Sequence, residues 1–242
     1  MRVLALLFSL FCLATPLIAQ EEAAPLSDLG LDLRVLNSEE QQEMIDACEI
    51  ALSYDRKDAG DICAMAIDPT SPRFLYLGFD DVIADATYIE CFSIDEEYLY
   101  TILFKTYGTY EAFAQNGSLF LYFVRGGTLF EFDLNGNVTS VYSSNDSSIA
   151  DNNEIIERLS NATIYTVEGK TFERCNDPLA LNFLQSNGSS LKVTALDGSS
   201  HYLYHASESR SWVLFASLVI AVTIVVIKVA NHVKEGQSNE EN

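Results

Sequence analysis

The chain has 242 residues, of which 48% are hydrophobic and 20% are charged, and its formal net charge is −21. The three acidic and three basic residues outside residues 20–211 cancel, so the whole negative excess lies between those positions. Such a charge argues against binding to nucleic acid or lying on anionic lipid, because both would be repelled, and it permits cationic partners or calcium.

Residues 1–19 have the three parts of a cleavable secretory signal. Arg2 supplies the positive start, an apolar run of eleven residues follows it, and Ala19 is a small residue at the expected cleavage point. Cleavage after Ala14 is the alternative. The apolar run is too short to span a bilayer. We therefore expect the exported chain to begin with residues 20–37, an acidic and proline-containing lead-in.

Residues 38–68 predict a helical hairpin. Ser38 and Gln41 match the capping-box pattern of a helix start, and the apolar residues after them recur at helical spacing. A second helical stripe follows a charged break at residues 55–58, and it consists of Ala59, Ile62, Cys63, Ala66 and Ile67. Because the connecting loop is short, antiparallel helices would bring Cys48 on the first stripe close to Cys63 on the second.

Residues 73–207 change to a periodicity of two and predict an antiparallel β-meander of about eight strands. Turn residues stand at Gly126-Gly127, Asn135-Gly136 and Asp197-Gly198, as expected for hairpins. A short helix is expected around residues 154–159. The segment SLFLYFV is apolar on both faces, which indicates a fully covered strand. The other expected strands are TYIECF, EYLYTILF, TLFEFD, VTSVY, TIYTV, TFERC, SLKVTAL and HYLYH.

Residues 212–230 predict a membrane-spanning helix. Sixteen residues from Trp212 onward carry no charge, and Lys228 can extend its ammonium group to the lipid headgroups. A buried core helix is the alternative, but the segment is apolar on every side. We therefore expect a single-pass protein whose N-terminal domain lies outside the cytoplasm, with residues 231–242 as a cytoplasmic tail. That location is the periplasmic side of the inner membrane in a bacterium, and the lumen or cell surface in a eukaryote.

Together these patterns predict an α+β fold class, in which an N-terminal helical hairpin precedes an antiparallel β-meander and one C-terminal transmembrane helix. Four cysteines remain after signal removal, and an even number in an exported domain indicates two disulfides. The helical stripes favour Cys48–Cys63, and Cys91–Cys175 follows by elimination. Five glycosylation sequons would be used in a eukaryote and unused in a bacterium, and they begin at Asn116, Asn137, Asn145, Asn161 and Asn187.

Two residue patterns resemble metal sites only superficially. His201 and His205 have the spacing of a helical metal pair, but the sequence between them alternates as a strand, which would place the rings about 13 Å apart. The segment after Asp133 resembles a calcium loop but has Val138 at its sixth position and Ser144 at its twelfth, where glycine and glutamate are needed. We therefore expect neither a metal nor a cofactor.

One acidic stretch offers candidate catalytic residues. Asp81, Asp85 and Glu90 lie beside aromatic residues, and paired carboxylates beside aromatic rings are what a glycosidase needs. A membrane-anchored hydrolase is therefore the alternative function. The leading hypothesis is a non-catalytic interaction or assembly module that contacts other envelope or cell-surface proteins. A small signalling receptor is disfavoured because the tail is too short to hold a signalling domain.

Overall fold

The computed structural model describes residues 26–57, 60–81, 86–176, 188–205, 216–226 and 228, and its strands form three antiparallel sheets. Sheet A has the strand order β1 (Leu33–Val35), β10 (Val138–Ser144), β9 (Thr128–Phe132), β8 (Ser118–Phe123) and β7 (Tyr110–Gln115). Sheet B has the order β2 (Ala51–Ser53), β6 (Tyr98–Phe104), β5 (Ala86–Ser93), β4 (Phe74–Asp81) and β3 (Asp61–Ile67). Sheet C has the order β11 (Ile164–Val167), β12 (Lys170–Cys175), β13 (Ser190–Thr194) and β14 (Ser200–His205).

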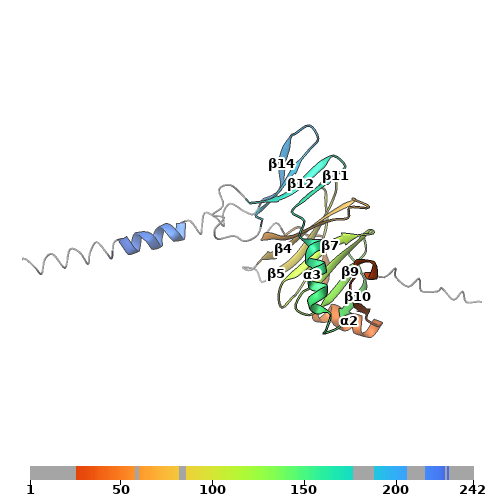
Figure 1. Ribbon diagram of the computed structural model, residues 1–242. Coiled ribbons are helices and arrows are strands. Elements are labelled where there is room, and N and C mark those ends of the chain that lie inside the picture. The colour runs from red at the N-terminus through yellow and green to blue at the C-terminus, as the bar shows by residue number, and fades with distance from the viewer. Residues whose placement is uncertain are drawn as a thin grey trace, which may run out of the picture.

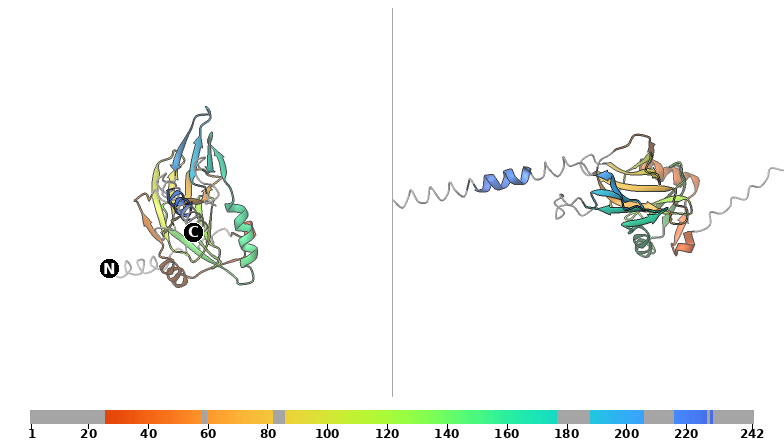
Figure 2. Two further views of the ribbon diagram at one scale, coloured as in Figure 1. Left: turned by 90° about the vertical axis from the view of Figure 1, so that its left-hand side faces the viewer. Right: turned by 90° about the horizontal axis from the view of Figure 1, so that it is seen from above.

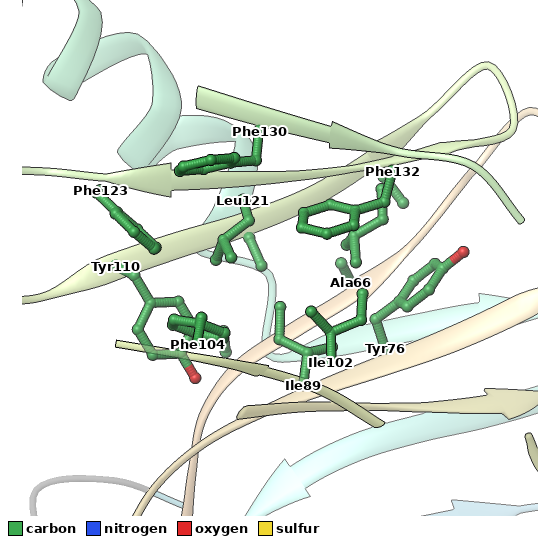
Figure 3. Close-up of a cluster of buried hydrophobic side chains, with 14 of the residues drawn as sticks. Ala66, Tyr76, Ile89, Ile102, Phe104, Tyr110, Leu121, Phe123, Phe130 and Phe132 are labelled. Atoms are coloured by element: carbon green, nitrogen blue, oxygen red, sulfur yellow. The ribbon is translucent and has the colours of Figure 1, made fainter. Parts of the chain in front are cut away.

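Sheet B is the middle layer of the molecule and is covered on both faces. One face packs against sheet A through a core that includes Ile89, Ile102, Leu121 and Phe130 (Figure 3). The other face packs against sheet C, whose strands lie above β4 and β5 in Figure 1. Strands buried on both faces carry long apolar runs rather than a clean alternation of apolar and polar residues.

The outer face of sheet A is covered by helical segments. They are η1 (Leu26–Leu29) and α3 (Ile149–Ser160), and Ile156 of α3 is fully buried against this face. Figure 2 shows α3 along one side of the molecule. The predicted short helix around residues 154–159 is thus present and is longer than expected. The expected covering of SLFLYFV is also present, because β8 places residues in the cores on both faces of sheet A.

The predicted α+β fold class is wrong, because the described residues are mostly antiparallel strands with only short helices. The predicted helical hairpin at residues 38–68 is also wrong, because its second helix is β3. Residues 61–67 are a strand with a bulge, in which Met65 faces sheet C while Ala64 and Ala66 face sheet A. A short apolar run that is buried on both faces has no clear period, so helix and strand cannot be distinguished by pattern alone. Gly60 precedes β3 with a φ of 98°, a conformation that favours glycine.

The first predicted helix is present as α2 (Ser38–Ala47). Its N-cap is Asn37 rather than Ser38, and the capping box is completed by Glu40 rather than Gln41. The Asn37 side chain accepts hydrogen bonds from the backbone N–H groups of Glu39 and Glu40, and the Glu40 carboxylate accepts one from the backbone N–H of Asn37. The helix start was therefore predicted one residue too late.

At the C-terminal end, residues 216–226 are helical. No helix in the described parts of the chain has both the length and the apolarity that crossing a membrane requires. The transmembrane helix predicted over residues 212–230 is corrected accordingly. The predicted signal at 1–19 and the tail at 231–242 lie outside the described residues, as does the lead-in before residue 26.

Candidate functional site

Of the predicted catalytic carboxylates, the structure describes Glu90 and the backbone of Asp81. Asp81 pairs with Ala86 across β4 and β5, and Glu90 lies four residues further along β5. At ~3.3 Å per residue, the backbones of Asp81 and Glu90 are about 13 Å apart along the strands. The Asp81 side chain and all of Asp85 lie outside the described residues, so the hydrolase stays a prediction.

Glu90 lies inside the molecule, on the face of sheet B that meets sheet C. Its side chain is 0% exposed. One carboxylate oxygen accepts a hydrogen bond of 2.8 Å from the backbone N–H of Lys57, and the other lies 3.8 Å from Nε of Arg56. An ion pair with a partly exposed arginine compensates the cost of burying this charge.

Arg56 connects this buried carboxylate to the neighbouring sheet. Its guanidinium group lies 5.2 Å from the ring centroid of Phe92 and donates a hydrogen bond of 3.5 Å to the backbone carbonyl of Leu203 in β14. Beside it, the Thr101 hydroxyl donates to the backbone carbonyl of Asp55. These contacts hold residues 55–57, which follow β2, against sheet B. Glu90 and Arg56 thereby connect sheet B to sheet C inside the molecule.

The structure also separates the cysteines that were predicted to form disulfides, and none of these four is in a disulfide. Cys91 faces the core between sheets A and B, whereas Cys175 belongs to sheet C on the opposite side of sheet B. Cys48 accepts a backbone hydrogen bond from Lys105, just after β6. Cys63 is in β3, which lies three strands away from β6, or about 14 Å, in sheet B. Cys48 and Cys63 are therefore too far apart for a disulfide, which needs Cα atoms closer than about 7 Å.

Burial makes these thiols poor nucleophiles. It raises the pKa of Cys63 to about 11 and that of Cys91 to about 12, so both are protonated at neutral pH. The Cys63 thiol donates a hydrogen bond of 2.8 Å to the Tyr110 hydroxyl, which donates in turn to the backbone carbonyl of Phe79. This chain of contacts joins β3, β4 and β7 at the edge where sheets A and B approach each other.

The two histidines of β14 do not act together in the structure. His201 lies 2.5 Å from a carboxylate oxygen of Glu96, in the turn between β5 and β6. The other carboxylate oxygen of Glu96 accepts a hydrogen bond of 3.0 Å from Lys170, which also donates to the backbone carbonyl of Ile94. This polar clamp joins sheet B to sheet C at the surface. The described residues contain no group of three or more side chains suited to holding a metal ion.

A small hollow opens at one end of the sandwich formed by sheets A and B. Its cavity volume is about 10 Å³, room for about one water molecule. The loop between β3 and β4 contributes Asp68 to its wall, β4 contributes the rings of Phe74 and Tyr76, and the turn between β7 and β8 contributes Gly117. The remaining lining residues are Ser71, Ala114, Ser118 and Leu134.

Asp68 is the charged residue of the hollow, and it is only 5% exposed. One oxygen accepts hydrogen bonds from the backbone N–H and the hydroxyl of Thr70, and the other accepts one of 2.6 Å from the backbone N–H of Gly117. Burial alone would raise the pKa of Asp68, but these donors outweigh it and lower the pKa. Asp68 therefore stays ionised. The segment Asp68-Pro69-Thr70 has the sequence pattern of a turn in which an aspartate side chain accepts hydrogen bonds from residues that follow it.

The described sequon asparagines lie at the surface. Asn116, Asn137, Asn145 and Asn161 are all exposed, whereas Asn187 lies outside the described residues. The side-chain amide of Asn137 donates to Asp133, and that of Asn145 donates to Asp32. Asn116 and Asn161 therefore present the sequon positions with the fewest competing hydrogen bonds of the four.

No family model, curated protein or solved structure matches the chain.

Proposed function

We propose that the chain is an acidic, non-catalytic interaction module that lies outside the cytoplasm and is attached to a membrane by its C-terminal segment. The helix at residues 216–226 carries this proposal, because all of its residues are exposed. The exposed fractions of its large apolar side chains run from 46% at Val219 to 60% at Val226. Contiguous exposed apolar surface of this kind marks an interaction site for a membrane surface or a protein, and we infer the former from the apolar residues on every side of the helix.

The β-rich domain supports the interaction part of the proposal. It presents large aromatic side chains that its own core does not use, among them Tyr54, which is 73% exposed, and Tyr107, which is 90% exposed. Tyrosine is enriched in protein interfaces because it combines apolar area with a polar hydroxyl group. Partners on the same side of the membrane are envelope proteins in a bacterium and cell-surface or lumenal proteins in a eukaryote. The secretory signal pattern at residues 1–19 supports that location.

Carbonate extraction of membranes tests the attachment. Ala221 lies in the middle of the described apolar helix, so a lysine there places a charge on the surface that the proposal assigns to lipid contact. Ala221→Lys should therefore move the chain from the extracted pellet to the soluble fraction. Ala195→Lys adds the same charge in an exposed turn of sheet C and should leave the chain in the pellet. If Ala221→Lys stays as firmly in the pellet as the parent, lipid does not surround the helix and the proposal fails.

A further inference from the structure

We propose that the outer face of sheet C joins two copies of this chain into a dimer. The strands of this sheet lie side by side in Figure 1, and one of its faces packs on sheet B. The proposal names a partner for the interaction module, so it rests on the proposed function. The charge of sheet C, the order of its outer side chains and the direction of its last strand support it.

Sheet C belongs to the nearly neutral part of an acidic chain. Residues 161–205 contain four acidic and three basic residues, whereas residues 26–160 contain 25 acidic and seven basic residues. The corresponding net charges are −1 and −18. Two copies that met through their acidic parts would repel each other. Because sheet C is an outer layer, contact through it keeps the acidic parts of both copies apart.

Four side chains cross the outer face of sheet C in one row. Direct pairing across the four strands gives the order Ile164, Glu173, Lys192 and Tyr202. Directly paired residues of antiparallel strands point to the same face. Phe172 and Val193 are neighbours of this row in the sequence and are buried against sheet B, so the row itself points outward.

The side chains of this row are accessible. The exposed fractions of Ile164 and Tyr202 are 55% and 49%, and Glu173 and Lys192 are partly exposed. Within the described ranges, neither of these two charged residues forms an ion pair. The next outward row consists of small hydroxyl residues, which are Thr166, Thr171, Thr194 and Ser200. Small side chains leave room for a second sheet at the usual spacing of ~10 Å.

The row is complementary to itself under two-fold symmetry. A two-fold axis that runs along the strands, midway between β12 and β13, reverses the order of the row in the second copy. Glu173 of each copy then faces Lys192 of the other, and Ile164 of each copy faces Tyr202 of the other. Each charge thus meets an opposite charge, and each apolar side chain meets an apolar surface.

The same axis allows both copies to be attached to one membrane. Rotation about an axis along the strands preserves the strand direction, so β14 of both copies ends on the same side of the dimer. The exposed apolar helix begins at residue 216, eleven residues after the end of β14 at His205. An axis that lay in the face but ran across the strands would direct the two β14 ends to opposite sides.

Energy transfer between two pools of the full chain in detergent micelles tests the proposal. One pool carries a donor fluorophore and the other an acceptor, both on a tag after Asn242. Transfer in the parent chain should rise with concentration and saturate. Lys192→Glu places a glutamate opposite Glu173 in both contacts, so it should weaken association by about tenfold or more. Glu173→Lys should weaken it for the same reason.

A mixture of these two variants tests contact between copies specifically. When one pool is Lys192→Glu and the other is Glu173→Lys, both charged contacts again join opposite charges. The mixture should therefore associate about as the parent does, although neither variant associates with itself. A folding defect within either variant could not produce that recovery. Arg158→Glu on α3 makes the same charge change on another surface and should associate as the parent does.

Three results would overturn the proposal. They are a parent chain without saturable transfer, a folded Lys192→Glu chain that associates as the parent does, and a mixture that associates no better than either variant alone. Melting temperatures close to that of the parent establish that the variants are folded. Carbonate extraction of Ala221→Lys does not depend on sheet C, so failure of either experiment leaves the other proposal standing.

Discussion

Among the described residues, Glu90 and Asp68 are carboxylates buried by different means. Glu90 lies against an arginine and accepts a backbone hydrogen bond, whereas Asp68 is held by neutral donors from two loops. The first arrangement ties the carboxylate to a charged partner, and the second ties it to the β3–β4 loop and the β7–β8 turn. Glu90 therefore connects sheet B to the segment over it, and Asp68 joins two loops.

A double-mutant cycle on Glu90 and Arg56 tests the structural role. Arg56→Met should lower the free energy of unfolding by about 2 kcal/mol, because it removes the charged partner of a fully buried carboxylate. The double variant with Glu90→Leu should recover most of that loss, since no buried charge remains. Denaturant unfolding measures both values. Strictly additive losses would show that the two side chains do not interact.

The Glu96 clamp predicts a dependence of stability on acid. Burial would raise the pKa of Glu96, but hydrogen bonds from Lys170 and His201 outweigh it and lower the pKa. A lowered pKa means that the unfolded chain binds the proton more readily, so the contribution is present above the unfolded pKa of ~4.5 and is lost as the pH falls through the folded pKa. Glu96→Gln should therefore lower stability at pH 7 and flatten its decline below about pH 5.

Chemical denaturation at a series of pH values measures that decline. Glu97→Gln is the matched control, because Glu97 is exposed in the same turn and Glu96 is the glutamate that binds Lys170 and His201. A Glu96→Gln chain whose stability falls with acid as steeply as the control would contradict the assigned role of the clamp.

At the scale of elements, helix starts and turns could be predicted from the sequence, whereas some buried strands could not. The start of α2 was missed by one residue because Asn37 and Ser38 are both good N-cap residues. The error at β3 has a deeper cause, because its apolar residues serve two cores at once. Strand β7 was missed although the Asn116-Gly117 turn that follows it is a strong hairpin signal.

Met65 distinguishes the strand from the predicted helix. In β3 it is 0% exposed and packs in the core between sheets B and C. Met65→Ala should therefore lower the free energy of unfolding by about 3 kcal/mol. In the predicted hairpin, Met65 would lie outside the apolar stripe, and the same substitution would cost almost nothing. Met44→Ala in α2 is the comparison, and it should cost less because Met44 is only partly buried.

At the scale of the whole molecule, the sequence predicted a β-rich antiparallel domain but not its division into three sheets. Hairpins are local, so turn residues reveal them. The pairing of β1 with β10 and the stacking of sheet C on sheet B join segments that are far apart in the sequence. Those contacts depend on which apolar faces match in space, and periodicity does not encode that choice.

The hollow shows the same limit for the candidate site. Its walls come from the β3–β4 loop, β4, the β7–β8 turn and the β9–β10 turn, which only the folded sandwich brings together. The acidic stretch from Asp81 to Glu90 was conspicuous in the sequence because its residues are close along the chain. Of that stretch the structure describes the backbone of Asp81 and all of Glu90, which lie four strand positions, or about 13 Å, apart along the strands.

The central claim is that the acidic domain lies outside the cytoplasm, and thiol labelling tests it most directly. Glu154 on α3 has a side chain that is 74% exposed, so Glu154→Cys adds an accessible thiol to a chain whose own described cysteines are buried or half-buried. The parent chain gives the background. A membrane-impermeant maleimide should label the variant from the extracytoplasmic side of intact membranes. Labelling only when the reagent is delivered to the cytoplasm would contradict the account.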